Sequence, residues 1–170
     1  MNAGLFTLSN FLLFQLGWFV CVLLGTQWAI MYTLAATCVH FYFSPSRQDD
    51  FIAVLLCTVI GLAHDLLLIH GGHILFAESS NWPPVWLSCL WVLMGLTLHH
   101  SLGWIYQRPL WAGLLGAVSG PLSYLAGVKL SSAQWSSSLM EVIPIMAALW
   151  LIVLPLHRLL SLRIKPYVSH

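Results

Sequence analysis

The residues of this chain that could do chemistry are histidines set in apolar sequence, one of which is followed directly by an aspartate. Imidazole and carboxylate groups can exchange protons, and both can bind zinc or iron. Ionisable groups within apolar sequence are costly, so they are normally paired with one another or functional. The residues concerned are His40, His64, Asp65, His70, His73, His99 and His100.

The sequence around these residues is that of a membrane protein. Hydrophobic residues make up 59% of the 170 residues, charged residues only 6%, and the mean hydropathy is +0.87. Soluble domains carry about 25% charged residues. No basic cluster is long enough to suggest nucleic acid binding, so we expect no nucleic acid partner.

Apolar runs of about the length needed to cross a bilayer fill nearly the whole chain. They predict an all-α fold, a polytopic membrane bundle of six transmembrane helices that forms a single integral membrane domain over residues 1–170. A polar loop is expected at 44–50 and a Ser-rich loop at 131–138, and Gly71-Gly72 leaves open where the third helix ends. The predicted helices are Leu5–Leu24, Trp28–Phe43, Phe51–Ile69, Pro84–Tyr106, Leu110–Val128 and Leu139–His157.

The cations are distributed unevenly between the two sides of this predicted bundle. With six spans, Lys129 lies on one side. Because short loops rich in Lys and Arg remain in the cytoplasm, we expect both termini to be cytoplasmic. The cations on the cytoplasmic side are Arg47, Arg108, Arg158, Arg163 and Lys165.

One polar layer is predicted in the outer half of the membrane. At a rise of about 1.5 Å per residue, Asp65 and Tyr124 come to lie at similar depth, roughly 20 Å from the inner face. Adjacent helix positions do not face each other, so His64 and Asp65 are each expected to need a partner from another helix. We predict a ligand-binding pocket open toward the outer face, and a structural, hydrogen-bonded Asp65 is an equally good interpretation. The candidate residues of this pocket are His64, Asp65, Tyr124 and Glu141.

A second polar layer is predicted in the inner half of the membrane. His40 lies near the inner end of the helix predicted at 28–43, and His99 and His100 lie near the inner end of the helix at 84–106. His99 shares a helix face with small residues, so it is expected to point into the bundle, toward His40 if the two helices meet. His100 is rotated from it by about 100° and is expected at the membrane interface.

The histidine spacing does not by itself predict a metal centre. Histidine-rich membrane oxygenases and desaturases hold two irons through HxxxH and HxxHH clusters. Here His70-xx-His73 and the His99-His100 pair are predicted at opposite faces of the membrane. A site of His64, His70, His73 and a carboxylate stays open as an alternative. Our expectation is structural, hydrogen-bonded histidines, with no metal and no cofactor.

Small residues predict how the helices pack. Glycines recur at spacings of three and four along the helix at 110–128, and Gly116 and Gly120 are part of this stripe. Such stripes let two backbones approach closely in lipid. We therefore expect this face to pack against a neighbouring helix rather than to leave space for a ligand.

Three segments resemble a family of small bacterial inner-membrane proteins known as a domain of unknown function. They are HDLLLIHGG at 64–72, HSLGW at 100–104 and GAVSGPLSYLAG at 116–127. The resemblance implies a multi-pass protein of the bacterial inner (plasma) membrane. Members of that family are often encoded beside lipid-modifying enzymes that are similar to cyclopropane-fatty-acid synthases, which implies a lipid-related context. The resemblance supplies no catalytic residues.

These observations favour a protein that binds a lipid or other hydrophobic small molecule, or that is accessory to lipid-modifying enzymes. The expected partners are membrane lipids, such a ligand and a membrane protein. One alternative is a solute-binding transport subunit, because the predicted architecture is similar to the substrate-binding subunits of energy-coupling-factor transporters. Another is an intramembrane enzyme that uses His64 and Asp65.

Overall fold

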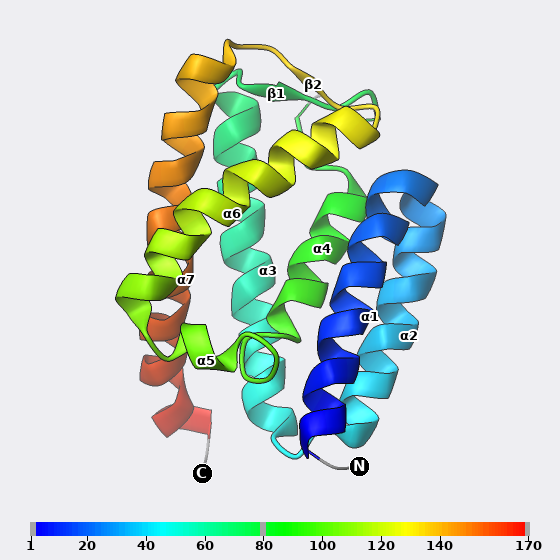
Figure 1. The fold of residues 1–170 in the computed structure, drawn as a ribbon, viewed down its shortest axis with the longest axis vertical. Helices are drawn as coiled ribbons and strands as arrows, with labels where there is room; N and C mark the ends of the chain where they lie inside the picture. The colour runs from blue at the N-terminus through cyan, green and yellow to red at the C-terminus, as the bar shows by residue number, and fades with distance from the viewer. Residues whose placement is uncertain (1–2, 79–80, 169–170) are drawn as a thin grey trace.

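The computed structural model describes residues 3–78 and 81–168, and within these residues the chain is almost entirely helical. Two short strands, β1 (Ile74–Leu75) and β2 (Gln134–Trp135), pair antiparallel at one end of the bundle (Figure 1). The helices are α1 (Ala3–Leu24), α2 (Thr26–Phe43), α3 (Arg47–His70), α4 (Val85–Gly95), α5 (Gly103–Tyr106), α6 (Pro109–Leu130) and α7 (Leu139–Val168).

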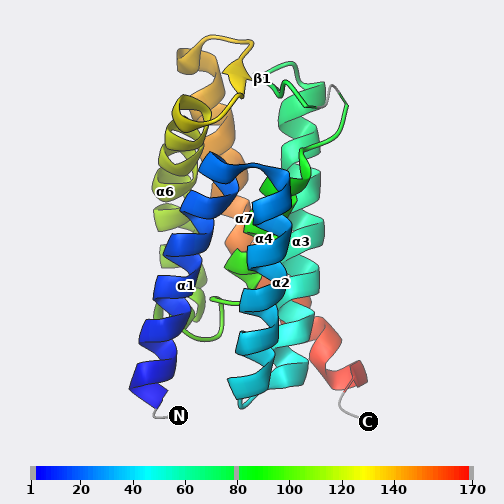
Figure 2. The same ribbon diagram turned by 90° about the vertical axis from the view of Figure 1, so that its right-hand side faces the viewer.

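The helices α1, α2, α3, α4, α6 and α7 run in alternating directions, so α1 begins and α7 ends at the same end of the bundle (Figures 1 and 2). The short α4 lies in the middle, where it packs against α1, α2 and α3. On the other side of the bundle α3 packs against α7, and α6 packs against α7. The end that holds both termini also holds α5, and the β-strands lie at the opposite end (Figure 1).

Four of the described helices are long and apolar enough to cross a membrane, which indicates that the chain is a membrane protein. Their outward faces carry large apolar side chains, such as Leu16 of α1 and Val118 of α6, which are more than half exposed. A surface of this kind is expected where lipid is the solvent. The four helices span Gly4–Leu24, Arg47–His70, Pro109–Leu130 and Leu139–Ile164.

The predicted continuous helix Pro84–Tyr106 is wrong, because α4 ends at Gly95 and irregular turns follow until α5. Near this break, polar side chains donate hydrogen bonds to backbone carbonyls. The Asn10 side chain of α1 donates to the Leu96 carbonyl at 3.0 Å, and the Thr97 hydroxyl donates to the Met94 carbonyl at 2.6 Å. The Leu96 carbonyl would otherwise accept from the His100 N–H of a continuous helix.

Other predicted boundaries also change. The third helix begins at Arg47 rather than at Phe51, so Asp50 belongs to the helix and not to a polar loop. The last helix continues beyond His157 to Val168. The third helix ends at His70, and Gly72 then adopts a φ of +69° that favours glycine, after which β1 begins. The strands were not predicted, because each contains only two residues.

Two stacked tryptophans join the halves of the bundle. The rings of Trp91 in α4 and Trp150 in α7 lie 5.3 Å apart at an angle of 20°. A Cβ at Gly61 of α3 would lie 1.9 Å from the Trp91 ring, and one at Gly120 of α6 would lie 2.3 Å from the Trp150 ring. The predicted glycine stripe on α6 therefore packs against a neighbouring helix, which is α7. Glycine is required at these two positions because the indoles occupy the space of a side chain.

We predict that Gly120→Ala destabilises the protein by about 1–3 kcal/mol, because the added methyl overlaps the Trp150 ring in a packed core. The matched control is Gly127→Ala in the same helix, where a Cβ would meet no atom within 4 Å. Thermal unfolding in detergent measures both variants. Equal melting temperatures would contradict the role of Gly120 as the contact surface for Trp150.

Candidate functional site

The inner polar layer is built around Asp50, which lies in the first turn of α3 and is 1% exposed. Its Oδ2 atom lies 3.0 Å from His40 Nε2 and 2.8 Å from His100 Nε2. Its Oδ1 atom lies 3.1 Å from His99 Nδ1. The Ser44 hydroxyl also donates to Oδ2. A buried carboxylate is tolerated when it receives several hydrogen bonds of this kind.

The three predicted inner-layer histidines are therefore brought together, but through a carboxylate that the sequence analysis had placed in a loop. His100 was expected to point away from His99, and this is wrong. Because α4 ends at Gly95, residues 99 and 100 are no longer fixed at successive positions of one regular helix. Both side chains can turn toward Asp50.

Asn10 of α1 contacts this cluster through His40 and also contacts the turns that follow α4. Its Oδ1 atom accepts from the Ser101 hydroxyl at 2.7 Å and from the Ser101 backbone N–H at 3.3 Å. Its Nδ2 atom donates to the Leu96 carbonyl and lies 3.3 Å from His40 Nδ1. Since the other contacts fix the orientation of the amide, Nδ1 of His40 accepts and Nε2 carries the proton. His40 therefore donates to Asp50.

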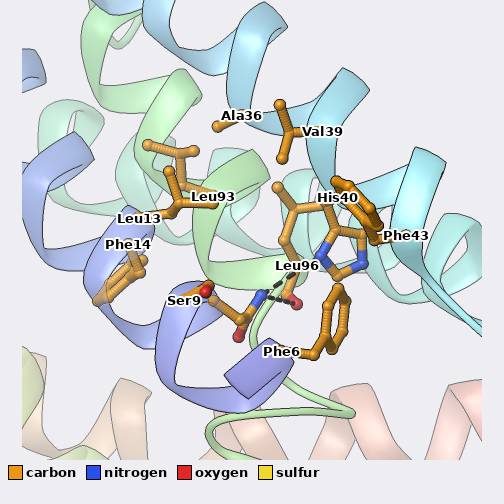
Figure 3. Close-up of a pocket in the computed structure, with 11 residues that line it drawn as sticks. Phe6, Ser9, Leu13, Phe14, Ala36, Val39, His40, Phe43, Leu93 and Leu96 are labelled. Atoms are coloured by element: carbon orange, nitrogen blue, oxygen red, sulfur yellow. Dashed lines mark hydrogen bonds between the residues drawn. The ribbon is translucent and has the colours of Figure 1, made fainter. Parts of the chain in front are cut away.

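Figure 3 shows where this histidine lies. His40 is drawn beside Phe6 of α1 and Phe43 of α2, with Leu96 next to it and Leu93 farther away, near Leu13. These residues line a small apolar pocket of about 30 Å³ between α1 and α2. The pocket holds no more than one or two water molecules, so it offers little space for a ligand.

Within the described residues, one group of histidine and carboxylate side chains has ligand atoms close enough for a metal, all within 4.8 Å of one another: His40, Asp50 and His100. A metal on His40 Nε2 requires the proton on Nδ1. The Asn10 amide nitrogen faces that atom as a donor. The residues present therefore fit a hydrogen-bonded carboxylate better than a metal centre.

A polar chamber of about 360 Å³ lies next to this cluster, at the end of the bundle that holds the termini and α5 (Figure 1). His99 is 17% exposed and lines this chamber, so Asp50 holds one ring nitrogen while the ring borders open space. The other lining residues are Ser46, Asp49, Leu98, Gly103, Tyr106, Gln107, Arg158, Ser161 and Leu162.

One wall of the chamber is fixed by His157, which is 1% exposed. Its Nε2 atom donates to the Ala53 carbonyl at 2.9 Å, so its Nδ1 atom accepts from the Tyr106 hydroxyl at 2.8 Å. The Tyr106 ring in turn lies 5.7 Å from the guanidinium carbon of Arg158. This distance allows a cation–π contact, which positions the cation at the chamber.

The outer polar layer is a packed cluster. The Tyr124 hydroxyl donates to Asp65 Oδ1, and the Trp91 indole N–H donates to Oδ2 at 2.8 Å. His64 Nδ1 lies 3.0 Å from Asp65 Oδ1, so the expectation that these neighbours would not contact each other is wrong. Although the two residues are adjacent in α3, both side chains point into the same space between the helices and contact each other there. His64, Asp65 and Tyr124 are thus brought together as predicted.

We predict that this layer opens toward the outer face, but in the structure it is closed. His64 is 2% exposed and Asp65 is 1% exposed, and the small apolar cavity that Tyr124 lines includes neither of them. Glu141 is exposed and does not join the cluster. His70 is exposed and bonds to the Leu66 carbonyl, and His73 faces Ser137, so neither completes the alternative metal site with His64.

Several residues of the chamber were not singled out from the sequence. Arg158 was treated only as a topology signal, and Tyr106 and His157 only as helix ends. Asp50 had a usable signal, because it lies four residues after Ser46 in a segment that can cap a helix, and an Asp in the first turn is favourable there. Asn10 had no signal, because its role depends on a carbonyl that is 86 residues away.

The model of one protein family, described as a protein of unknown function (DUF2878), matches residues 7–156 of the chain. The chain belongs to this family. No curated protein and no solved structure matches the chain. Membership agrees with the resemblance drawn from the sequence segments, and it assigns no activity.

We predict that Asp50→Asn destabilises the protein by about 3 kcal/mol, because an amide donor would face the His40 N–H and a buried cluster would lose its charge. Unfolding in detergent measures the effect. Glu141→Gln is the control, and this exposed substitution should change stability by no more than about 0.5 kcal/mol. Equal stability of the two variants would show that Asp50 does not hold the cluster together.

Proposed function

We propose that this protein is a multi-pass membrane protein that binds the polar headgroup of a membrane amphiphile in the chamber bordered by His99 and Arg158. The observation that carries the proposal is the chamber of about 360 Å³, which combines charged, amide and hydroxyl side chains. Binding sites commonly combine a defined cavity with a few converging polar groups.

The position of the chamber favours an amphiphile over a small soluble solute. It lies at one end of helices that are long enough to span a bilayer, where the headgroups of lipids are found. Leu98 and Leu162 supply apolar lining beside the polar groups. The outward face of α7 continues from this end with exposed leucines, including Leu159. A ligand with its headgroup in the chamber could keep its acyl chains in lipid.

We further infer that the chain crosses the bacterial inner membrane six times with both termini in the cytoplasm. Two shorter segments, α2 and α4 with its continuation to α5, would complete the crossings made by the four long helices. Arg47 begins α3 and Arg108 precedes α6 at the chamber end, and Lys129 lies in the last turn of α6 at the opposite end. This asymmetry supports a cytoplasmic position for the chamber.

The topology predicts different accessibilities for single cysteines in an otherwise cysteine-free variant. A cysteine at Ser132, in the loop before β2, should react with an impermeant thiol reagent in intact cells. A cysteine at Gln107, between α5 and α6, should react only after the membrane is opened. Labelling of Gln107→Cys in intact cells would contradict the proposed orientation.

Filling the chamber tests the proposed binding. Gly103 lines it, and a Cβ there would have its nearest neighbour at 3.8 Å, so Gly103→Leu can place its side chain in the chamber. We expect an amphiphile to co-purify with the native protein in mild detergent, to be found by mass spectrometry, and to be lost from Gly103→Leu. The control is Ser119→Leu on the exposed face of α6. Equal retention by both variants would place the ligand elsewhere.

A second candidate function, an intramembrane enzyme, is favoured by one observation. Asp50 engages Nδ1 of His99, and the ring borders the chamber, an arrangement that can orient a histidine for proton transfer. The candidate His/Asp pair is therefore Asp50 and His99 rather than Asp65 and His64. Conversion of a bound amphiphile by the native protein, but not by His99→Gln, would support this function.

A further inference from the structure

Resting on the proposed function, we propose that the headgroup bound in the chamber carries a phosphate, which Arg158 binds directly beside the ring of His99.

Among the side chains that the structure describes, Arg158 is a cation that borders the chamber. Its side chain is half-buried, and its described contact is with the Tyr106 ring. Among residues 3–78 and 81–164, the ion pairs join histidines to aspartates, and none of them includes Arg158. A guanidinium that borders a polar chamber can bind an anion there with several of its N–H donors. Its planar set of N–H donors matches the oxygens of a phosphate.

The buried carboxylate beside the chamber already has several partners of its own. Asp50 is occupied by His40, His99 and His100 and by the Ser44 hydroxyl. Asp49 also lines the chamber, but it has an interaction of its own. A cationic ligand would have to compete with Arg158 for the same space. The arrangement therefore favours an anion at the guanidinium.

His99 borders the same chamber. Its Nδ1 atom lies 3.1 Å from Asp50 Oδ1, and the side chain is 17% exposed, so the remaining edge of the ring faces the space that the headgroup would occupy. Neutral donors complete the lining, because Ser46, Ser161 and Gln107 border the same chamber.

The size of the chamber suits a headgroup. A water molecule occupies about 30 Å³ in the liquid, so a volume of about 360 Å³ accommodates a phosphate, a glycerol unit and some water. The same phosphate chemistry occurs in a lipid and in soluble phosphates. The experiment must therefore compare the two sources.

The test uses the purified full-length protein in detergent and follows binding by thermal shift and native mass spectrometry. The probes are phosphatidic acid, diacylglycerol with the same acyl chains, and inorganic phosphate. We expect phosphatidic acid to bind and to raise the melting temperature, and diacylglycerol to bind much more weakly. Arg158→Gln should weaken binding of phosphatidic acid roughly ten- to a hundredfold, since hydrogen bonds to a charged group are lost.

Matched variants separate the role of Arg158 from a general loss of charge or of folding. Arg163→Gln removes the same charge from an exposed position of α7 that does not line the chamber, and it should leave binding unchanged. If Arg158→Gln does not fold, Arg158→Lys and His99→Gln provide the same test. Arg158→Lys should bind more weakly because it lacks the planar guanidinium.

The possible outcomes distinguish the proposed phosphate from the proposed binding of an amphiphile, on which it rests. Equal binding of phosphatidic acid and diacylglycerol, unaffected by the Arg158 variants, would overturn the phosphate and leave amphiphile binding intact. Arg158-dependent binding of inorganic phosphate without binding of lipid would support the phosphate site and overturn the lipid source. If none of the three probes binds and no amphiphile co-purifies, the proposed function fails as well.

Discussion

A carboxylate withdrawn from water must receive hydrogen bonds from the protein, and the chamber end of this bundle is arranged around that requirement at Asp50. Its partners come from the end of α2, the connection after α2 and the turns that follow α4. Asn10 adds α1, because it contacts both His40 and the backbone of the same turns. One buried charge thus positions segments that are far apart in the sequence.

The early end of α4 follows from the same requirement and has a consequence for the site. In a regular helix the Cα–Cβ bonds of His99 and His100 would be separated by about 100° around the axis, and the irregular turns remove this constraint. The irregular turns permit both contacts, and they lead into α5, where Gly103 and Tyr106 border the chamber. The loss of helical structure here therefore creates the space that the proposed ligand would occupy.

The other end of the bundle satisfies its buried carboxylate in a different way. Asp65 receives its hydrogen bonds from Tyr124 and Trp91, and the aromatic rings exclude water around it. Gly61 and Gly120 leave the space for the indoles of Trp91 and Trp150. The cluster is closed, with Asp65 only 1% exposed, so it is well suited to hold α3, α4 and α6 together. The inner cluster differs because one of its histidines borders open space.

The sequence by itself determined the membrane class, the approximate positions of most helices and several residues of each polar layer, because hydropathy and the cost of buried charges are local properties of the chain. His64, Asp65 and Tyr124 could be placed together from depth alone. Tertiary structure decided the break in α4, the burial of Asp50, the exclusion of Glu141 and the existence of the chamber. Each of these depends on which groups from distant segments meet: the Leu96 carbonyl is taken by Asn10, and the Asp50 carboxylate is shared by three histidines. Such pairings are not encoded in the spacing of neighbouring residues, so only the packed bundle reveals them.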